Sequence, residues 1–211
     1  MNLRRVTFLV HEGKPQAVEL EKELTRWLAE RDIAVVDDDP DIVISLGGDG
    51  TVLRAAREAH AFDAPLLAVN LGTLGYLTEV DAGNERRALE RISAGDYEIE
   101  ERMMLECAAP DDGRTLLGLN EVLVERSDRY RLVRLDVRIS GERLATFNAD
   151  GVIVATPTGS TAYALSAGGP IVSPRAECVL VVPVSPHMFF SRPFVVSPDD
   201  VVEITVGDPT G

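Results

Sequence analysis

The sequence predicts two domains, an α/β domain with a parallel sheet over residues 1–95 and a β-rich domain over residues 96–211. In the first half, short β-branched apolar runs alternate with amphipathic helical stretches, which is typical of parallel strands joined by right-handed crossovers. After Gly95 the apolar residues recur with a period of two, which is typical of strands joined by turns. A chain of 211 residues has enough apolar content for one large or two small packed domains.

In the first domain, helices are expected where apolar side chains recur at helical spacing with charges opposite. We expect strands at 5–10, 33–36, 42–46 and 66–69, and helices at 15–31, from about residue 52, and at 85–93. In the second domain we expect strands at 116–125, 132–139, 144–156, 179–184 and 201–206.

The first domain is organised around residues 41–56, where a buried strand is followed by Gly47-Gly48-Asp49-Gly50-Thr51. We expect Thr51 to cap an apolar helix that starts near Val52. A strand, a glycine turn and a helix together aim backbone N–H groups and a helix dipole at a phosphate. The Rossmann fingerprint fails here because Leu53 replaces its third glycine, and the P-loop fails because its lysine is absent.

Asp49 is unusual because a carboxylate in such a loop repels a phosphate, so its presence there suggests a specific role. It can take a proton from an attacking hydroxyl or hold Mg²⁺. The alternative is a tight turn in which the Asp side chain bonds its own backbone. This stretch by itself leaves both open.

The formal net charge is −14, from 35 acidic and 21 basic residues, and Lys14 and Lys22 are the only lysines. Such a surface repels nucleic acid and anionic membranes, so we expect neither as a partner. A composition rich in aspartate and poor in lysine resembles proteins of salt-accumulating, halophilic cells. A moderately acidic mesophilic protein is the alternative.

The sequence gives no sign of a structural metal, a disulfide or a membrane segment. Cys107 and Cys178 form no CxxC pair, and the three histidines are scattered. No apolar run approaches a membrane-spanning length, and residues 1–10 lack the long apolar segment of a signal peptide. We therefore expect a cytoplasmic protein.

Two polar clusters stand out in the second half. Asn120 and Glu121 can accept from and donate to an amide or a pair of hydroxyls, although such a pair is often only a strand entry. Residues 156–163 concentrate hydroxyls around a glycine before a helical turn through Ser166. This favours a polar, phosphorylated ligand over the alternative of a capped turn.

Five segments, in this order, resemble the NAD kinase family, whose members phosphorylate NAD to NADP. They cover most of the chain and are LGGDGTVLRA at 46–55, VNLGTLGYL at 69–77, GLNEVLVER at 118–126, NADGVIVATPTGSTAYALSAGGPIVSP at 148–174 and, more weakly, PVSPHMFFSRP at 183–193. GGDG alone is less specific, since it also resembles diacylglycerol and sphingosine lipid kinases and phosphofructokinases.

The resemblance implies that the second domain is sandwich-like and that the active site lies in a cleft between the domains. It implies that Asp49 accepts the proton of the adenosine ribose 2′-hydroxyl, while ATP or polyphosphate supplies the phosphoryl group with Mg²⁺ or another divalent cation. Gly47, Gly48 and Thr51 would serve the phosphate donor. The residues implied to bind NAD are Asp49, Gly50, Arg54, Tyr76, Asn120, Glu121, Asp150, Thr158, Thr161, Ala162, Tyr163 and Ser166.

The chain also departs from the family pattern. Asn148 stands where many members carry a basic residue, so the resemblance does not extend to one phosphate contact, and Tyr76 stands where the family often has Phe. Members continue through further strands past the position of Gly211, so we expect a shortened or compact member. We also expect a homo-oligomer, either a dimer or a tetramer. A lipid kinase and a non-catalytic NAD-binding regulator are the alternative functions.

Overall fold

The structure is a computed structural model that describes residues 3–72, 75–108, 113–128, 131–187 and 192–207. The chain divides into two compact units, residues 1–100 and residues 101–211. Each unit has a hydrophobic core of its own.

The first unit is built on a parallel sheet whose strand order is β2-β1-β3-β4-β5. Its strands are β1 Arg5–Val10, β2 Ala34–Val35, β3 Ile42–Gly47, β4 Leu66–Asn70 and β5 Val80–Asp81. Its helices are α1 Pro15–Ala29, α2 Asp49–Ala61 and α3 Glu85–Ser93. The predicted α/β unit with a parallel sheet is confirmed.

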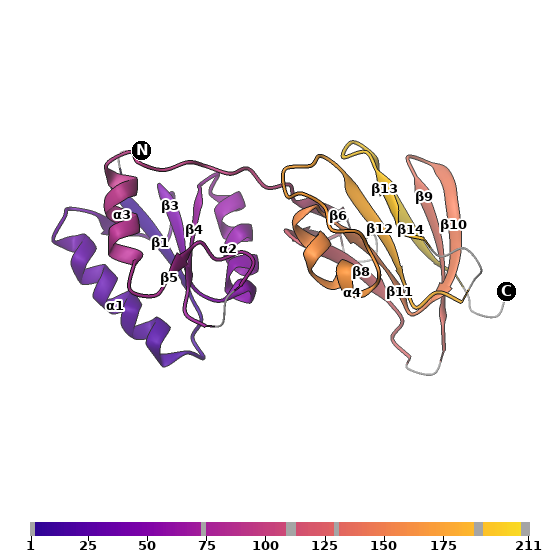
Figure 1. The fold of residues 1–211 in the computed structure, drawn as a ribbon, viewed down its shortest axis with the longest axis horizontal. Coiled ribbons are helices and arrows are strands. Elements are labelled where there is room, and N and C mark those ends of the chain that lie inside the picture. Colours follow the sequence, from indigo (N-terminus) through magenta and orange to yellow (C-terminus); the bar gives the residue numbers. More distant parts are fainter. Residues whose placement is uncertain (1–2, 73–74, 109–112, 129–130, 188–191, 208–211) are drawn as a thin grey trace. The chain divides into compact units, whose positions relative to one another are not determined.

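Helices cover both faces of this sheet (Figure 1). On one face, Leu24 and Leu28 of α1 and Leu89 of α3 pack in the main core. On the other, Ala55 and Ala59 of α2 pack with Val43 of β3. Since both faces are covered, every residue of β3 is buried, which explains its continuous apolar run. The loop after β3 therefore starts from a rigid strand in the middle of the sheet.

The second unit is antiparallel and β-rich. Its sheets have the orders β10-β9-β14, β13-β12-β11-β8 and β6-β7. Its strands are β6 Leu105–Ala108, β7 Thr115–Gly118, β8 Glu121–Glu125, β9 Val133–Ile139, β10 Glu142–Ala149, β11 Gly151–Ala155, β12 Val179–Val184, β13 Phe194–Val196 and β14 Val202–Gly207. A 3₁₀ turn, η1 Thr158–Thr161, and a short helix, α4 Tyr163–Ser166, follow β11.

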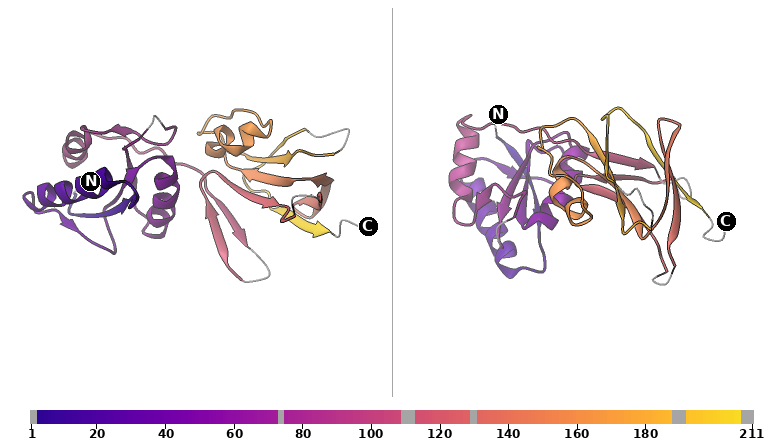
Figure 2. Two further views of the ribbon diagram at one scale, coloured as in Figure 1. Left: turned by 90° about the horizontal axis from the view of Figure 1, so that it is seen from below. Right: turned by 45° about the vertical axis from the view of Figure 1, so that its right-hand side comes forward.

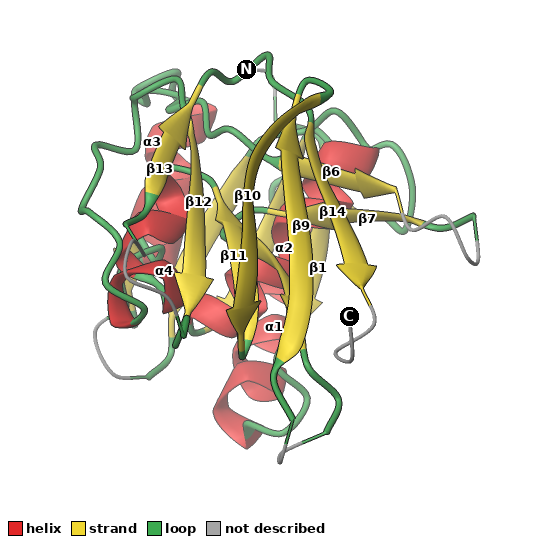
Figure 3. Cartoon of the chain, turned by 90° about the vertical axis from the view of Figure 1, so that its right-hand side faces the viewer, coloured by secondary structure: helices red, strands yellow, loops and turns green. Residues whose placement is uncertain are grey.

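The two larger sheets of this unit share one core, with strands of both visible in Figure 3. Leu135, Val137 and Phe147 from one sheet pack with Val152 and Val181 from the other. This is the layered packing of a β-sandwich, as predicted. The β6–β7 hairpin extends from the rest of the unit in the left view of Figure 2.

Two predicted strands are wrong because each proves to be two strands. The run 116–125 breaks at Leu119-Asn120, which separates β7 from β8. The run 144–156 breaks at Asp150, where the chain passes from one sheet to the other. Apolar residues resume within two residues after each break, so the sequence predicts a single strand for each run.

The predicted cap of the central helix is also wrong. Helix α2 begins at Asp49, and its N-cap is Gly48 in an extended conformation. Thr51 lies inside the first turn and is buried, and its N–H donates to the carbonyl of Gly48 at 2.8 Å. Asp49 is thus the acidic residue of the first turn, where the helix dipole favours negative charge.

Candidate active site

Asp49 is held in one orientation by backbone donors of the loop that follows β4. Its Oδ2 accepts the N–H of Tyr76 at 2.9 Å, and its Oδ1 accepts the N–H of Leu77 at 3.1 Å. The side chain therefore bonds a distant loop, and the alternative of a carboxylate that bonds its own turn does not apply. A half-buried carboxylate oriented by two donors is a suitable general base.

Two glycines allow the backbone to pack closely against side chains at the start of α2. A Cβ at Gly75 would overlap the Asp49 carboxylate, standing 2.8 Å from its Cγ. A Cβ at Gly47 would overlap the side chain of Thr51. Glycine is needed at both positions because the chain approaches its neighbours too closely for any side chain.

The start of α2 is open on the side where a ligand can approach. A Cβ at Gly48 or Gly50 would have no neighbour within 4 Å. Arg54 is exposed one turn further along α2, and the Tyr76 side chain is 81% exposed. The N-terminus of a helix, open glycines and an arginine together form a site where a phosphate can bind.

In the second unit, Asn120 and Glu121 lie at the entry to β8, against the η1 turn. The carbonyl of Asn120 accepts the N–H of Thr156 at 2.8 Å, and a Cβ at Gly159 would overlap that same carbonyl. The Oε2 of Glu121 is buried and has no hydrogen-bond partner among the described residues. Burial raises the pKa of the Glu121 carboxyl. A ligand hydroxyl or amide that donates to this oxygen would satisfy it.

Asp150 lies between β10 and β11 and is paired. Its Oδ1 lies 2.6 Å from the Nε of Arg126, whose backbone N–H also donates to the Asp150 carbonyl at 2.9 Å. The pair is two-thirds or more buried, so it fixes the carboxylate at the strand junction.

Most hydroxyls of the predicted 156–163 cluster serve the local fold. Thr156 donates to the Leu119 carbonyl at 2.6 Å, and Ser160 donates to the Val172 carbonyl at 3.2 Å. Thr161 donates to the carbonyl of Thr158 at 3.3 Å. Solvent-exposed side chains remain on the short α4 helix, where Tyr163 is 42% exposed and Ser166 is also exposed.

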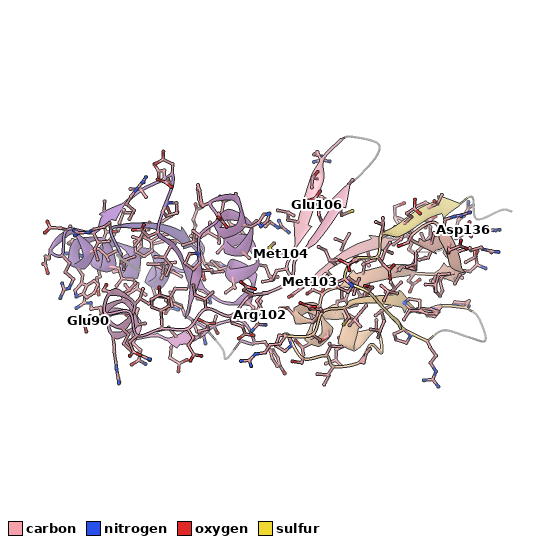
Figure 4. The ribbon with its side chains drawn as sticks, turned by 90° about the horizontal axis from the view of Figure 1, so that it is seen from above. Glu90, Arg102, Met103, Met104, Glu106 and Asp136 are labelled. Atoms are coloured by element: carbon pink, nitrogen blue, oxygen red, sulfur yellow. The ribbon has the colours of Figure 1, made fainter. Side chains whose placement is uncertain are left out.

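The Thr158 hydroxyl accepts from Arg102 at 3.3 Å. Arg102 lies on the segment that leads into β6, where it is labelled in Figure 4. Ala162, between η1 and α4, is half-buried.

The sequence reasoning overlooked four residues that build these surroundings, Leu77, Gly75, Arg102 and Arg126. Leu77 and Gly75 act through backbone geometry, which leaves no signature in a side chain. Arg126 and Asp150 are far apart along the chain, and only the pairing of β8 with β11 brings them together. Thr73 and Leu74, within the predicted 69–77 segment, and residues 188–191, within the 183–193 segment, lie outside the described residues.

A cavity of about 790 Å³ lies in the first unit, beside the carboxyl ends of β4 and β5. It is lined by Gln16, Glu19, Leu20, Glu23, Asn70, Leu71, Gly72, Asp81, Ala82 and Glu85. Four carboxylates in this lining disfavour a phosphate. The start of α2 is therefore the better phosphate site.

Within the ranges that the structure describes, no three His, Cys, Asp or Glu side chains cluster closely enough to hold a metal ion. Across the same residues, no helix combines the length and apolar character needed to cross a bilayer.

Both units match family models of known proteins. Residues 33–97 match the ATP-NAD kinase N-terminal domain, and residues 119–211 match the ATP-NAD kinase C-terminal domain. The chain is 42% identical to the NAD kinase of Heliobacterium modesticaldum over 95% of its own length and 79% of that protein. It is 36% identical to the NAD kinase of Thermoanaerobacter pseudethanolicus over 98% of its own length and 81% of that protein.

The fold is shared with solved structures of NAD and NADH kinases. The yeast NADH kinase, complexed with NADH, matches 98% of this chain and 69% of its own, with a TM-score of 0.87 and 27% identity. An NAD kinase from Archaeoglobus fulgidus, in complex with ATP, matches 96% of this chain and 80% of its own, with a TM-score of 0.74 and 28% identity. With matches of this extent in both units, the chain belongs to the NAD kinase family.

Proposed function

We propose that this chain phosphorylates the 2′-hydroxyl of the adenosine ribose of NAD, with ATP or polyphosphate as the donor, to form NADP. One observation carries the assignment: Asp49 stands at the start of α2 with both carboxylate oxygens oriented by the N–H groups of Tyr76 and Leu77. A base fixed beside a phosphate-binding helix start is what phosphoryl transfer to a hydroxyl requires. The relatives named NAD kinase support the choice of substrate.

In this mechanism Asp49 accepts the proton of the 2′-hydroxyl as that oxygen attacks the terminal phosphorus. Gly47, Gly48 and Thr51 form the turn that faces the phosphate donor, and the dipole of α2 favours its negative charge. Gly50 leaves room for the ribose beside the base, since nothing lies within 4 Å of its Cβ position.

The remaining predicted residues are proposed to bind NAD. Glu121 accepts from a hydroxyl or amide of NAD through the buried oxygen that has no other partner. The exposed rings of Tyr76 and Tyr163 pack on NAD rings. The other proposed contacts come from Arg54, Asn120, Asp150, Thr158, Thr161, Ala162 and Ser166.

Mg²⁺ fits this arrangement as a companion of the donor. The described residues offer no cage of three acidic or histidine ligands, and Mg²⁺ is usually held by one or two carboxylates, water and substrate phosphates. Asp49 is the carboxylate nearest the phosphate-binding turn. The bound cation would offset phosphate charge, which matters in a chain of net charge −14.

The two alternatives explain less. A lipid kinase must approach an anionic membrane, and an acidic chain is repelled from one. A non-catalytic NAD-binding regulator leaves the oriented Asp49 without a role. We further propose a cytoplasmic location, a homo-oligomer and adaptation to high salt.

The test is to incubate the protein with NAD, ATP and Mg²⁺ and to measure NADP with an NADP-specific dehydrogenase. A parallel reaction with polyphosphate identifies the donor, and one with diacylglycerol tests the lipid kinase. We expect NADP from the parent protein and almost none from Asp49→Asn. Lipid phosphorylation without NADP would overturn the proposal, as would tight NAD binding without turnover by either donor.

A further inference from the structure

The backbone carbonyl of Leu71 receives two side-chain donors from the beginning of α1. The Nε2 of Gln16 lies 2.6 Å from this oxygen, and the Nζ of Lys14 lies 3.1 Å from it. Lys14 is the N-cap of α1 and Gln16 lies in its first turn. Leu71 is buried and directly follows β4.

The same short segment is also tied to the turn that carries Asp49. The N–H of Leu71 donates to the carbonyl of Gly47 at 2.7 Å. The N–H of Gly72 donates to the Oδ1 of Asn70, a side chain that is 93% buried, at 3.0 Å. Residues 70–72 are therefore fixed to α1 by two side-chain donors and to the β3–α2 turn by a backbone bond.

The bond to Gly47 ties residues 70–72 to Asp49, which lies two residues after Gly47. Tyr76 and Leu77 follow on the same stretch of chain, and their N–H groups hold the carboxylate. A displacement of the Leu71 peptide moves the Gly47 carbonyl to which its N–H donates, and this shifts the turn that carries Asp49 relative to the two N–H groups. Because Gly75 packs tightly against Asp49, the carboxylate has little room to shift without disturbing its two hydrogen bonds.

We propose that Lys14 and Gln16 are positioning residues for Asp49, acting through the Leu71 carbonyl without touching substrate. The consequence for catalysis rests on the proposed function. Glu19 and Glu23 of α1 line the neighbouring cavity, so Lys14 and Gln16 differ from the acidic residues around them. Their shared bond to the Leu71 carbonyl gives both side chains a role there. The lysine also sits close to Gly72, since a Cβ there would be 2.9 Å from its Nζ.

The test compares Lys14→Met, Gln16→Met and the double variant with the matched control Lys22→Met. Lys22 is the other lysine of the chain, lies on the same helix, is 62% exposed and pairs with Glu19 at 3.6 Å. We expect the double variant to lose about ten-fold to a hundred-fold in kcat, as a small misplacement of a catalytic group does. The KM for NAD should stay within about three-fold of the parent value, because ground-state binding is untouched. Lys22→Met should match the parent protein.

Two further measurements separate positioning from general destabilisation. Hydrogen exchange at the Tyr76 and Leu77 amides should be faster in the double variant, with the urea midpoint of unfolding close to that of the parent. Lys14→Arg retains a donor and should keep most of the kcat that Lys14→Met loses.

Parental kcat and parental exchange in the double variant would overturn the inference, even where the parent protein makes NADP. A kcat that falls only in step with the urea midpoint would also overturn it. If the parent protein makes no NADP, the proposed function fails, and exchange at residues 76 and 77 still decides whether Lys14 and Gln16 keep Asp49 on its two donors.

Discussion

Gly75 and Asp49 pack so closely that a Cβ at residue 75 would stand 2.8 Å from the carboxylate carbon of Asp49. The neighbouring residues Tyr76 and Leu77 donate their N–H groups to that carboxylate. One backbone segment therefore both orients the proposed base and limits the space around it.

Gly75→Ala should lower kcat by at least about ten-fold, because the methyl group displaces the carboxylate or its two donors. The free energy of unfolding should fall by no more than about 2 kcal/mol, because the methyl group meets only the end of one side chain and the φ of Gly75 is not positive. Steady-state kinetics and urea unfolding on the same preparation check both points. An alanine variant with parental kcat would show that the close packing has no catalytic consequence.

Asp49→Asn should lower kcat by roughly two to four orders of magnitude, because an amide cannot accept the ribose proton. Affinity for NAD should change little. Asp38→Asn is the control, as the Asp38 side chain is 90% exposed in the loop before β3. A turnover of Asp49→Asn within a few-fold of the parent would exclude the proposed base.

Glu121→Gln should stabilise the protein at neutral pH and weaken NAD binding by about ten-fold or more, because a hydrogen bond to a charged acceptor is lost. Burial raises the pKa of Glu121 in the folded state, so the folded chain holds this proton to a higher pH than the unfolded chain does. The free energy of unfolding therefore falls as pH rises from the unfolded pKa to the folded one, and stays lower above it.

The stability gain of Glu121→Gln should accordingly disappear below the ordinary pKa of a glutamate. Urea unfolding across a pH series, with NAD titrations at each pH, measures both effects. A variant less stable than the parent at pH 7 would mean that the buried carboxylate has a partner in solution.

Tyr163→Ala should weaken NAD binding and leave ATP binding nearly unchanged, because the exposed ring at the start of α4 is proposed to contact NAD. Leu165→Ala is a matched control, since this side chain is on the same helix and 40% exposed. Isothermal titration with each nucleotide distinguishes the two sites. Loss of ATP binding with NAD binding intact would reverse the assignment.

The melting temperature should rise steeply with KCl, because the 14 excess negative charges repel one another and salt screens them. At about 1 M salt the screening length is roughly 3 Å, so only adjacent charges still interact. The double variant Asp32→Asn, Asp63→Asn should show a smaller rise. Both residues are exposed with φ values of 57° and 51°, a backbone conformation that Asn also adopts. A flat melting temperature in the parent protein would refute salt adaptation.

The sequence by itself determined the two kinds of architecture and most elements of the first unit, although the two-residue strand β5 was not predicted. Helix α3 was predicted at residues 85–93, where the structure has it, because apolar spacing and the Ala94-Gly95 stop are local signals. The sequence also pointed to Asp49, since a carboxylate between glycines after a buried strand is unusual in itself. Family membership followed from ordered motifs, which need no coordinates.

Only the tertiary structure decided what surrounds those residues. The two donors of Asp49 are backbone N–H groups 27 and 28 residues away, and every residue except proline carries the same group. Arg126 meets Asp150 because β8 pairs with β11, and most hydroxyls of residues 156–163 are used by nearby backbone groups. Local sequence encodes propensity and periodicity, whereas these contacts depend on which distant segments the packed sheets bring together.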